Sequence, residues 1–92
     1  MYKIKRKQLI NAKKLGVIIK PSKSKNKKLD VFKNNKKIAS IGAKGYGDYA
    51  TYIQTRGLKF ALERKRLYKR RHERFRKIKG TNSYYADQIL WT

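Results

Sequence analysis

The chain has 92 residues, which is enough for one domain with a small hydrophobic core. Its 27 Lys or Arg against five acidic residues give a formal net charge of +22, which predicts a polyanionic partner and disfavours an enzyme for neutral small molecules. The absence of cysteine excludes disulfides and thiolate metal sites, and no apolar run approaches the roughly 20 residues of a membrane-spanning helix.

The first 28 residues hold eleven Lys or Arg and no acid. The pattern predicts a short helix at 8–15 that stops at Gly16, a strand at 17–19 and a flexible, Lys-rich link at 22–28. Because like charges keep such a segment extended until counterions are displaced, we expect residues 1–28 to be a basic arm that orders on a polyanion. A solubilising tail is the alternative. The candidate contacts of the arm are Lys23, Lys25, Lys27 and Lys28.

Residues 29–92 are expected to form the folded domain, beginning with a β-hairpin. Residues 29–32 and 37–41 alternate as strands do, and the Asn-Asn pair in the four residues between them tolerates the positive φ of a turn. Three glycines within 42–47 follow, without the Gly-Lys-Ser/Thr of a phosphate loop, and predict a further turn. Alternatively, this segment contacts a nucleic-acid backbone or bases through Lys44, Tyr46 and Tyr49.

A β-prone segment at 50–55 predicts a third strand, and a long helix is expected at 58–79. This helix holds eleven Lys or Arg against two acids. Its apolar residues recur at intervals of seven and eight, so that one face can pack on the domain while the other presents charge. The apolar face comprises Phe60, Ala61, Leu67, Tyr68, Phe75 and Ile78. The charged face, which we call the basic strip, comprises Arg64, Lys65, Arg66, Lys69, Arg70 and Arg74.

The C-terminal segment 84–91 concentrates aromatic residues after a turn and predicts a short helix. Its apolar side chains are expected to plug the core. Docking on a partner through Tyr85, Leu90 and Trp91 is the alternative, because Trp and Tyr are common interface anchors. Together the elements predict an α+β domain: a β-hairpin or three-stranded sheet packed by one long basic helix, with a short C-terminal helix.

The sequence shows no catalytic constellation. The one histidine, His72, lies among arginines, whose charges favour its neutral form. The five acids are scattered, and no two have the close spacing of a metal site or an acid/base pair. We therefore expect no enzymatic activity, no metal and no cofactor.

A series of ordered motifs between Leu29 and Trp91 carries a resemblance to a known family. They are Val31-Phe32, Lys36-Lys37-Ile38, Gly42-Ala43, Gly45-Tyr46, Asp48-Tyr49, Glu63-Arg64, Tyr68, Arg71-His72, Ser83-Tyr84 and Leu90-Trp91. In order and spacing they resemble small, basic, largely uncharacterised proteins of nucleocytoplasmic large DNA viruses, including algal viruses. The first 28 residues lie outside this similarity, and residues 53–55 depart from the charged residues expected there.

The resemblance implies a viral origin and a non-enzymatic role in the virion, with assembly in the host cytoplasm or nucleus. A minor capsid or core-associated protein of this kind binds capsid proteins, packaged DNA or both through its charge. Sequence-independent compaction of duplex DNA is the alternative. An anionic membrane surface is a further possible partner. An RNA-bound protein has a similar composition, and only the resemblance speaks against it.

Overall fold

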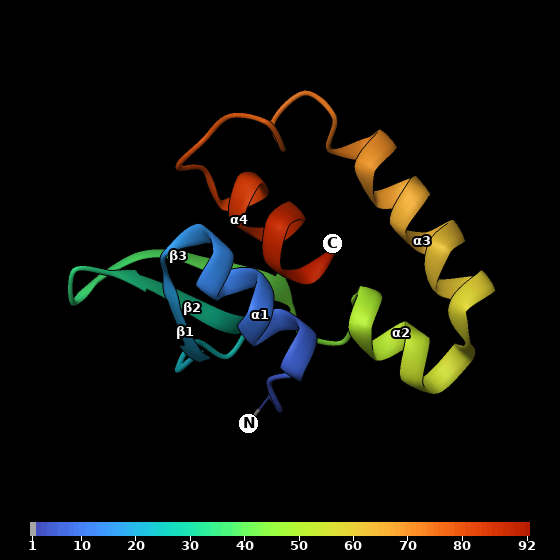
Figure 1. Cartoon of the computed structure of the whole chain (residues 1–92), viewed down its shortest axis with the longest axis horizontal. Coiled ribbons are helices and arrows are strands. Elements are labelled where there is room, and N and C mark those ends of the chain that lie inside the picture. Colours follow the sequence, from blue (N-terminus) through green and yellow to red (C-terminus); the bar gives the residue numbers. More distant parts are fainter. Residues whose placement is uncertain (1) are drawn as a thin grey trace.

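The computed structural model describes residues 2–92 and shows an α+β fold with a three-stranded antiparallel sheet and four helices (Figure 1). Helices α1 and α4 pack against each other and on the sheet, and α2 and α3 lie side by side next to them. Within residues 2–92, none of the helices is both long and apolar enough to cross a membrane. The elements in chain order are α1 (Arg6–Leu15), β1 (Ile18–Pro21), β2 (Lys27–Lys33), β3 (Lys36–Ala43), α2 (Tyr49–Arg56), α3 (Leu58–Arg71) and α4 (Asn82–Leu90).

The β2–β3 hairpin confirms the predicted pairing. Asn34 and Asn35, with φ values of 53° and 66°, form its tight turn, and two positive φ angles match the twist of the flanking strands. Leu29 on β2 pairs with Ile41 on β3, and both side chains point into the core together with Val31. All three side chains are at most 1% exposed, so the hairpin supplies a large part of the core against which the helices pack.

The N-terminal residues form part of the same fold. Helix α1 and strand β1 agree with the predicted helix and strand, and Gly16 ends α1 with a φ of 73°. Strand β1 pairs with β2, and Ile19 on β1 and Val17 just before it bury their side chains in the core. Strand β2 begins at Lys27, so the boundary expected after residue 28 falls inside a strand. Residue 1 of the expected arm lies outside the described residues.

The third strand predicted at 50–55 is wrong, since this segment forms helix α2. Asp48 starts the helix: its carboxylate accepts a hydrogen bond at 2.9 Å from the backbone N–H of Thr51. Tyr49 and Ala50, in the first turn, are buried against the rest of the fold. The cap and this packing override the β propensity of the segment.

The single long helix predicted over 58–79 is also wrong. Helix α3 ends at Arg71, and residues 72–80 form a series of turns. These turns bring Arg76 to the buried Asp87 on α4, with 3.6 Å between the charged atoms. Helix α3 packs mainly on α2, so the sheet is covered by α1 and α4 and no single helix dominates the fold.

The early end of α3 changes the exposure of its expected apolar face. Ala61 is fully buried, but Phe75 and Ile78 lie in the turns and are each 50% exposed. Arg74 likewise leaves the helix. The predicted apolar face of residues 58–79 therefore packs on the fold only within α3 and not in the turns that follow it.

Helix α4 closes the core at the C-terminal end, as the core-plug interpretation expects. Leu90 is 2% exposed and Trp91 is 9% exposed. The Trp91 ring stacks on Tyr68 of α3, with centroids 4.6 Å apart and planes 10° apart. Of the possible docking tip, only Tyr85 keeps part of its side chain at the surface.

Candidate functional site

The acidic side chains are distributed unevenly between the interior and the surface. Asp30, Asp48 and Asp87 are 6%, 1% and 0% exposed, whereas Glu63 and Glu73 lie on the surface. Across residues 2–92 these carboxylates form no group of three, with or without histidine, that could hold a metal ion. Burial of three of the five acids leaves a surface whose charge is almost entirely positive.

Asp48 anchors the N-terminal segment to the sheet and to α2. Its carboxylate accepts a hydrogen bond from the Tyr2 hydroxyl at 2.6 Å and pairs with the Lys28 ammonium at 3.1 Å. The Gln8 amide in turn donates to the Tyr2 hydroxyl at 2.7 Å. Burial and the Asp48 carboxylate raise the pKa of Tyr2 to about 12, so the hydroxyl remains a donor well above neutral pH. Lys28, one of the expected arm contacts, is therefore committed to the interior.

This arrangement predicts a loss of stability in acid. Burial raises the pKa of the Asp48 carboxyl, but the Tyr2 hydrogen bond and the Lys28 charge outweigh it, and the pKa lies below its ordinary value. A carboxyl with a lowered pKa in the folded state stabilises the fold above its unfolded pKa of about 4 and loses that contribution as the pH falls through the folded value. We expect the urea midpoint to hold from neutrality to about pH 5 and to fall below about pH 4. Asp48→Asn should show a flatter acid profile than wild type. Identical profiles for the two proteins would contradict this role of Asp48.

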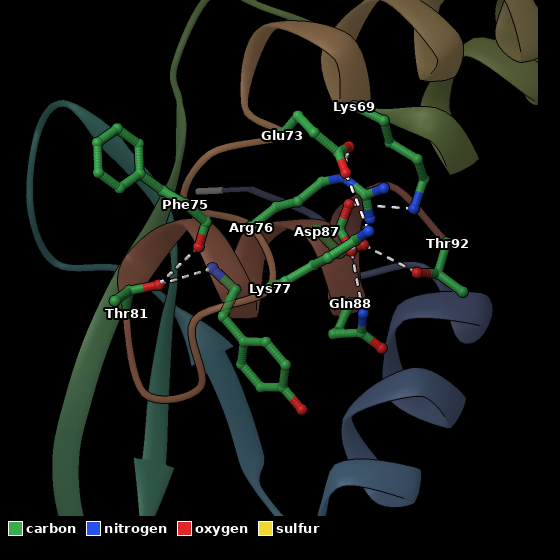
Figure 2. A network of polar contacts seen from close by, with 10 residues as sticks. Lys69, Glu73, Phe75, Arg76, Lys77, Thr81, Asp87, Gln88 and Thr92 are labelled. Atoms are coloured by element: carbon green, nitrogen blue, oxygen red, sulfur yellow. Dashed lines mark hydrogen bonds and ion pairs between the residues drawn. The ribbon is translucent and has the colours of Figure 1, made fainter.

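A second network centres on Asp87 and joins α3, the turns after it and α4 (Figure 2). The Asp87 carboxylate pairs with Lys69 at 3.0 Å and with Arg76 at 3.6 Å, and it accepts a hydrogen bond from the Gln88 amide at 3.0 Å. The carboxylate of the exposed Glu73 also pairs with Arg76, with 2.8 Å between Glu73 Oε2 and Arg76 Nε. Lys69, a member of the basic strip, is thus used to neutralise a buried acid.

The structure divides the basic strip into an inner and an outer group. The inner group comprises Arg64, Lys65 and Lys69, all partly buried. The guanidinium of Arg64 lies 5.9 Å from the ring centre of Tyr52, and the ammonium of Lys65 lies 4.5 Å from that of Tyr49. Burial and neighbouring positive charges lower the pKa of Lys65. Arg64 and Lys65 therefore pack against aromatic rings of the fold as well as presenting positive charge to solvent.

The outer group lies on the solvent-exposed side of the helix. Arg66 and Arg70 are exposed, and their spacing places Lys59, which the sequence interpretation omitted, on the same side. Arg66 pairs with the exposed Glu63 at 2.6 Å, a contact that water can replace. We call Lys59, Arg66 and Arg70 the outer face of α3. Arg74 is exposed in the turns beyond it.

The other predicted contacts are scattered over the surface. Lys23 and Lys25 are exposed in the turn between β1 and β2, and Lys44 and Tyr46 are exposed in the glycine-containing loop after β3. Tyr49, grouped with Lys44 and Tyr46 from the sequence, is only 8% exposed and belongs to the core. The predicted contacts therefore do not form one continuous site.

A cleft of about 340 Å³ lies among the end of the sheet, the loop at 42–48, α3 and α4. Sequence reasoning missed this cleft because its walls come from distant parts of the chain. The one local signal of it in the sequence was the glycine at position 47. A Cβ atom on Gly47 would lie 2.4 Å from the Tyr52 ring, so glycine lets the loop close on that ring. The side chains that supply charge or aromatic surface to the cleft are Lys27, Lys28, Tyr46, Asp48, Tyr52, Arg64, Tyr68, Arg71, His72 and Trp91.

Three stacked rings form part of the cleft lining. His72 stacks on Tyr68 with centroids 4.3 Å apart, and Tyr68 stacks on Trp91. Burial and the charge of Arg71 lower the pKa of His72, while burial and the charge of Asp87 raise the pKa of Tyr68 to about 12. Both rings are consequently uncharged at neutral pH, and the positive charge of the cleft comes from its Lys and Arg residues.

Comparison with known proteins finds one similarity. Residues 17–52 match a family of unknown function (DUF5754). The matched segment holds β1, β2, β3, the loop that lines the cleft and the first half of α2. No curated protein and no solved structure matches the chain. Over less than half of its length, this chain is therefore similar to a family whose function is not established.

Proposed function

We propose that the chain is a non-enzymatic structural protein that binds polyanions, acting as a minor capsid- or core-associated protein of a large DNA virus. The observation that carries the proposal is the burial of Asp30, Asp48 and Asp87, which leaves the positive charge of the surface almost uncompensated. The viral setting rests on the sequence resemblance. Packaged DNA and acidic inner surfaces of the capsid are the partners that such a charge fits.

Among the exposed cations, two groups lie far apart on the molecule. Helix α3, which carries the outer face, lies at one end of the fold, and the turn of the β2–β3 hairpin, flanked by Lys33 and Lys36, lies at the other (Figure 1). The longest extent of the fold is 37 Å. A polyanion can therefore approach from either end without meeting a cluster of acidic side chains.

Binding through these cations is expected to be driven by release of counterions. A duplex that engages about six phosphates gives a slope of about −5 for log K against log salt, with little dependence on base sequence. Ion pairs such as Arg66–Glu63 present no obstacle, because exposed pairs are weak and exchange readily for phosphate.

Sequence-independent compaction of DNA is a second candidate function. The observation that favours it is the placement of cations at opposite ends of the fold, which lets one molecule contact two duplexes. A capsid-associated protein needs only one such surface to hold DNA. The two functions therefore differ in whether both ends must be basic at the same time.

Two matched charge reversals test this proposal. Lys59→Glu with Arg70→Glu changes the outer face of α3, and Lys33→Glu with Lys36→Glu changes the hairpin turn. All four side chains are exposed, and each pair changes the net charge by the same amount. We expect reversal at the end that holds the duplex to weaken its binding about tenfold or more and to reduce the salt slope by about 2. Fluorescence anisotropy across a salt titration measures both effects.

The same titration separates the candidate functions. Wild-type binding that persists at about 150 mM salt, with light scattering from bridged duplexes that either reversal abolishes, would favour compaction. Binding that disappears by that salt concentration would favour a denser, protein-built surface. Affinity and slope that remain unchanged in both reversals would show that these cations are the wrong surface.

A further inference from the structure

We propose that the cleft binds one unpaired nucleotide of a nucleic-acid chain, with its phosphate on the cationic side chains and its base against the aromatic ones. This inference rests on the proposed binding of polyanions and specifies a ligand that phosphate contacts with a duplex would not provide. Three properties of the cleft carry it: its free cations, an unpartnered aromatic ring at its rim and its size.

The cleft offers positive charge that the fold does not use. Arg71 is exposed and Lys27 is partly exposed, and within residues 2–92 neither pairs with an acidic side chain. Among the described residues, Asp48 is the only acid that lines the cleft, and its carboxylate pairs with the Lys28 ammonium at 3.1 Å. An arginine free of carboxylates presents a planar fork of donors that suits a phosphate.

The rim of the cleft carries an aromatic ring with nothing stacked on it. Tyr46 is 71% exposed, and among the described residues no ring or cation packs on its face. The same cleft is lined by the stacked rings of Tyr68, His72 and Trp91. Each base has an apolar face that stacks on such rings without regard to sequence.

The dimensions of the cleft favour a single nucleotide over a duplex. Its volume of about 340 Å³ falls at the lower end of the roughly 300–1,000 Å³ found for small-ligand sites. A paired base inside a duplex shows only its edges, so stacking on a protein ring requires a base that is unpaired or at an end. The ligand class is therefore a nucleotide unit of single-stranded DNA or RNA.

The fluorescence of Trp91 reports directly on binding in the cleft, because this side chain lines the cleft and is the only tryptophan in the chain. We would follow its emission, excited at the red edge of its absorption, during titration with thymidine monophosphate. Thymidine and inorganic phosphate are titrated separately. We expect a saturable change with the nucleotide and a much weaker response to either half alone. Equal responses to nucleotide and inorganic phosphate would overturn the role of the base.

Substitutions on the cleft test which side chains hold the nucleotide. Tyr46→Ala and Arg71→Gln should each weaken binding of thymidine monophosphate and of a single-stranded oligonucleotide about 5- to 100-fold, as loss of a base stack or a phosphate contact does. Arg6→Gln is the matched control for thymidine monophosphate, since Arg6 is an exposed arginine on α1 that does not line the cleft. All three residues are exposed, so folding should be unchanged, as circular dichroism would verify.

Three oligonucleotides of equal length distinguish failure of this inference from failure of the proposed function. Single-stranded DNA, single-stranded RNA and duplex DNA are compared at matched salt, and tighter binding of either single strand supports the cleft. If duplex binding is strong and Tyr46→Ala leaves single-strand binding unchanged, the inference is overturned while polyanion binding stands. If thymidine monophosphate binds but no oligonucleotide does, the claim of a nucleic-acid ligand is overturned along with the proposed binding of DNA.

Discussion

Replacing Asp87 by asparagine is expected to lower the free energy of unfolding by about 3–5 kcal/mol, because removing one partner of a buried ion pair leaves the other without compensation. The carboxylate is fully buried and pairs with Lys69 and Arg76. The loss of unfolding free energy should fall toward the lower end of this range, since the Lys69 side chain is 27% exposed and water can reach its ammonium. A chain of this length is stabilised by roughly 5–14 kcal/mol in total, so urea denaturation will register the change clearly.

The chain supplies a matched control for Asp87→Asn. Glu73→Gln also removes one negative charge from a side chain that contacts Arg76, but Glu73 lies at the surface. We expect only a small effect of Glu73→Gln. Adding Lys69→Met to Asp87→Asn should recover part of the loss, because no unpaired ammonium then remains beside the amide. Equal destabilisation by Asp87→Asn and Glu73→Gln would show that burial of this network does not matter.

Replacing Trp91 by alanine is expected to cost about 3–5 kcal/mol of unfolding free energy, the range for removing a large aromatic side chain from a core. Trp91 is 9% exposed and lies against both Tyr68 and Tyr52. Its loss removes contacts that hold α3 and α2 to the C-terminal end of the chain. Thermal unfolding followed by circular dichroism measures the effect without relying on the missing fluorophore.

Trp91→Phe is the control for that experiment, because it keeps a ring to stack on Tyr68 and should lose much less stability. The docking alternative makes the opposite forecast. If Trp91→Ala unfolds at the wild-type temperature, the ring is not a core element and an external partner becomes its most sensible role.

The sequence correctly predicted those parts of the fold whose backbone conformation depends on a few neighbouring residues. Asn34-Asn35 tolerates the backbone angles of a tight hairpin turn, and Gly16 ends a helix in the left-handed conformation. Both signals act over a handful of atoms. They predict where the chain turns but say little about what it packs against afterwards.

Helix α2 shows how a local signal can be present and still be outweighed by composition. The segment 50–55 is rich in β-prone residues, which predicted a strand. Asp48 stands one residue before the helix and caps it through the N–H of Thr51. An acidic residue at that position is a helix-start signal, and giving it more weight would have identified α2.

The end of α3 and the cleft could not be predicted from periodicity. No glycine or proline marks the end of the helix at Arg71. The chain turns there, and Arg76 in the turns contacts Asp87, which follows eleven residues later on another helix. The cleft likewise depends on packing among the loop at 42–48, α3 and the C-terminal Trp91. The basic strip was visible in the sequence, but which of its members point inward was decided by the rings of Tyr49 and Tyr52 and by the carboxylate of Asp87.

The burial of the aspartates also governs how the surface charge responds to its surroundings. The exposed Glu63 and Glu73 have lowered pKa values through their cationic partners, so both stay ionised at neutral pH. The pKa of His72 is lowered as well, so that it is already uncharged at neutrality. Neither these carboxylates nor His72 changes its charge as the pH rises from neutrality. The hold of the exterior on an anion is therefore adjusted mainly by ionic strength and by competing polyanions.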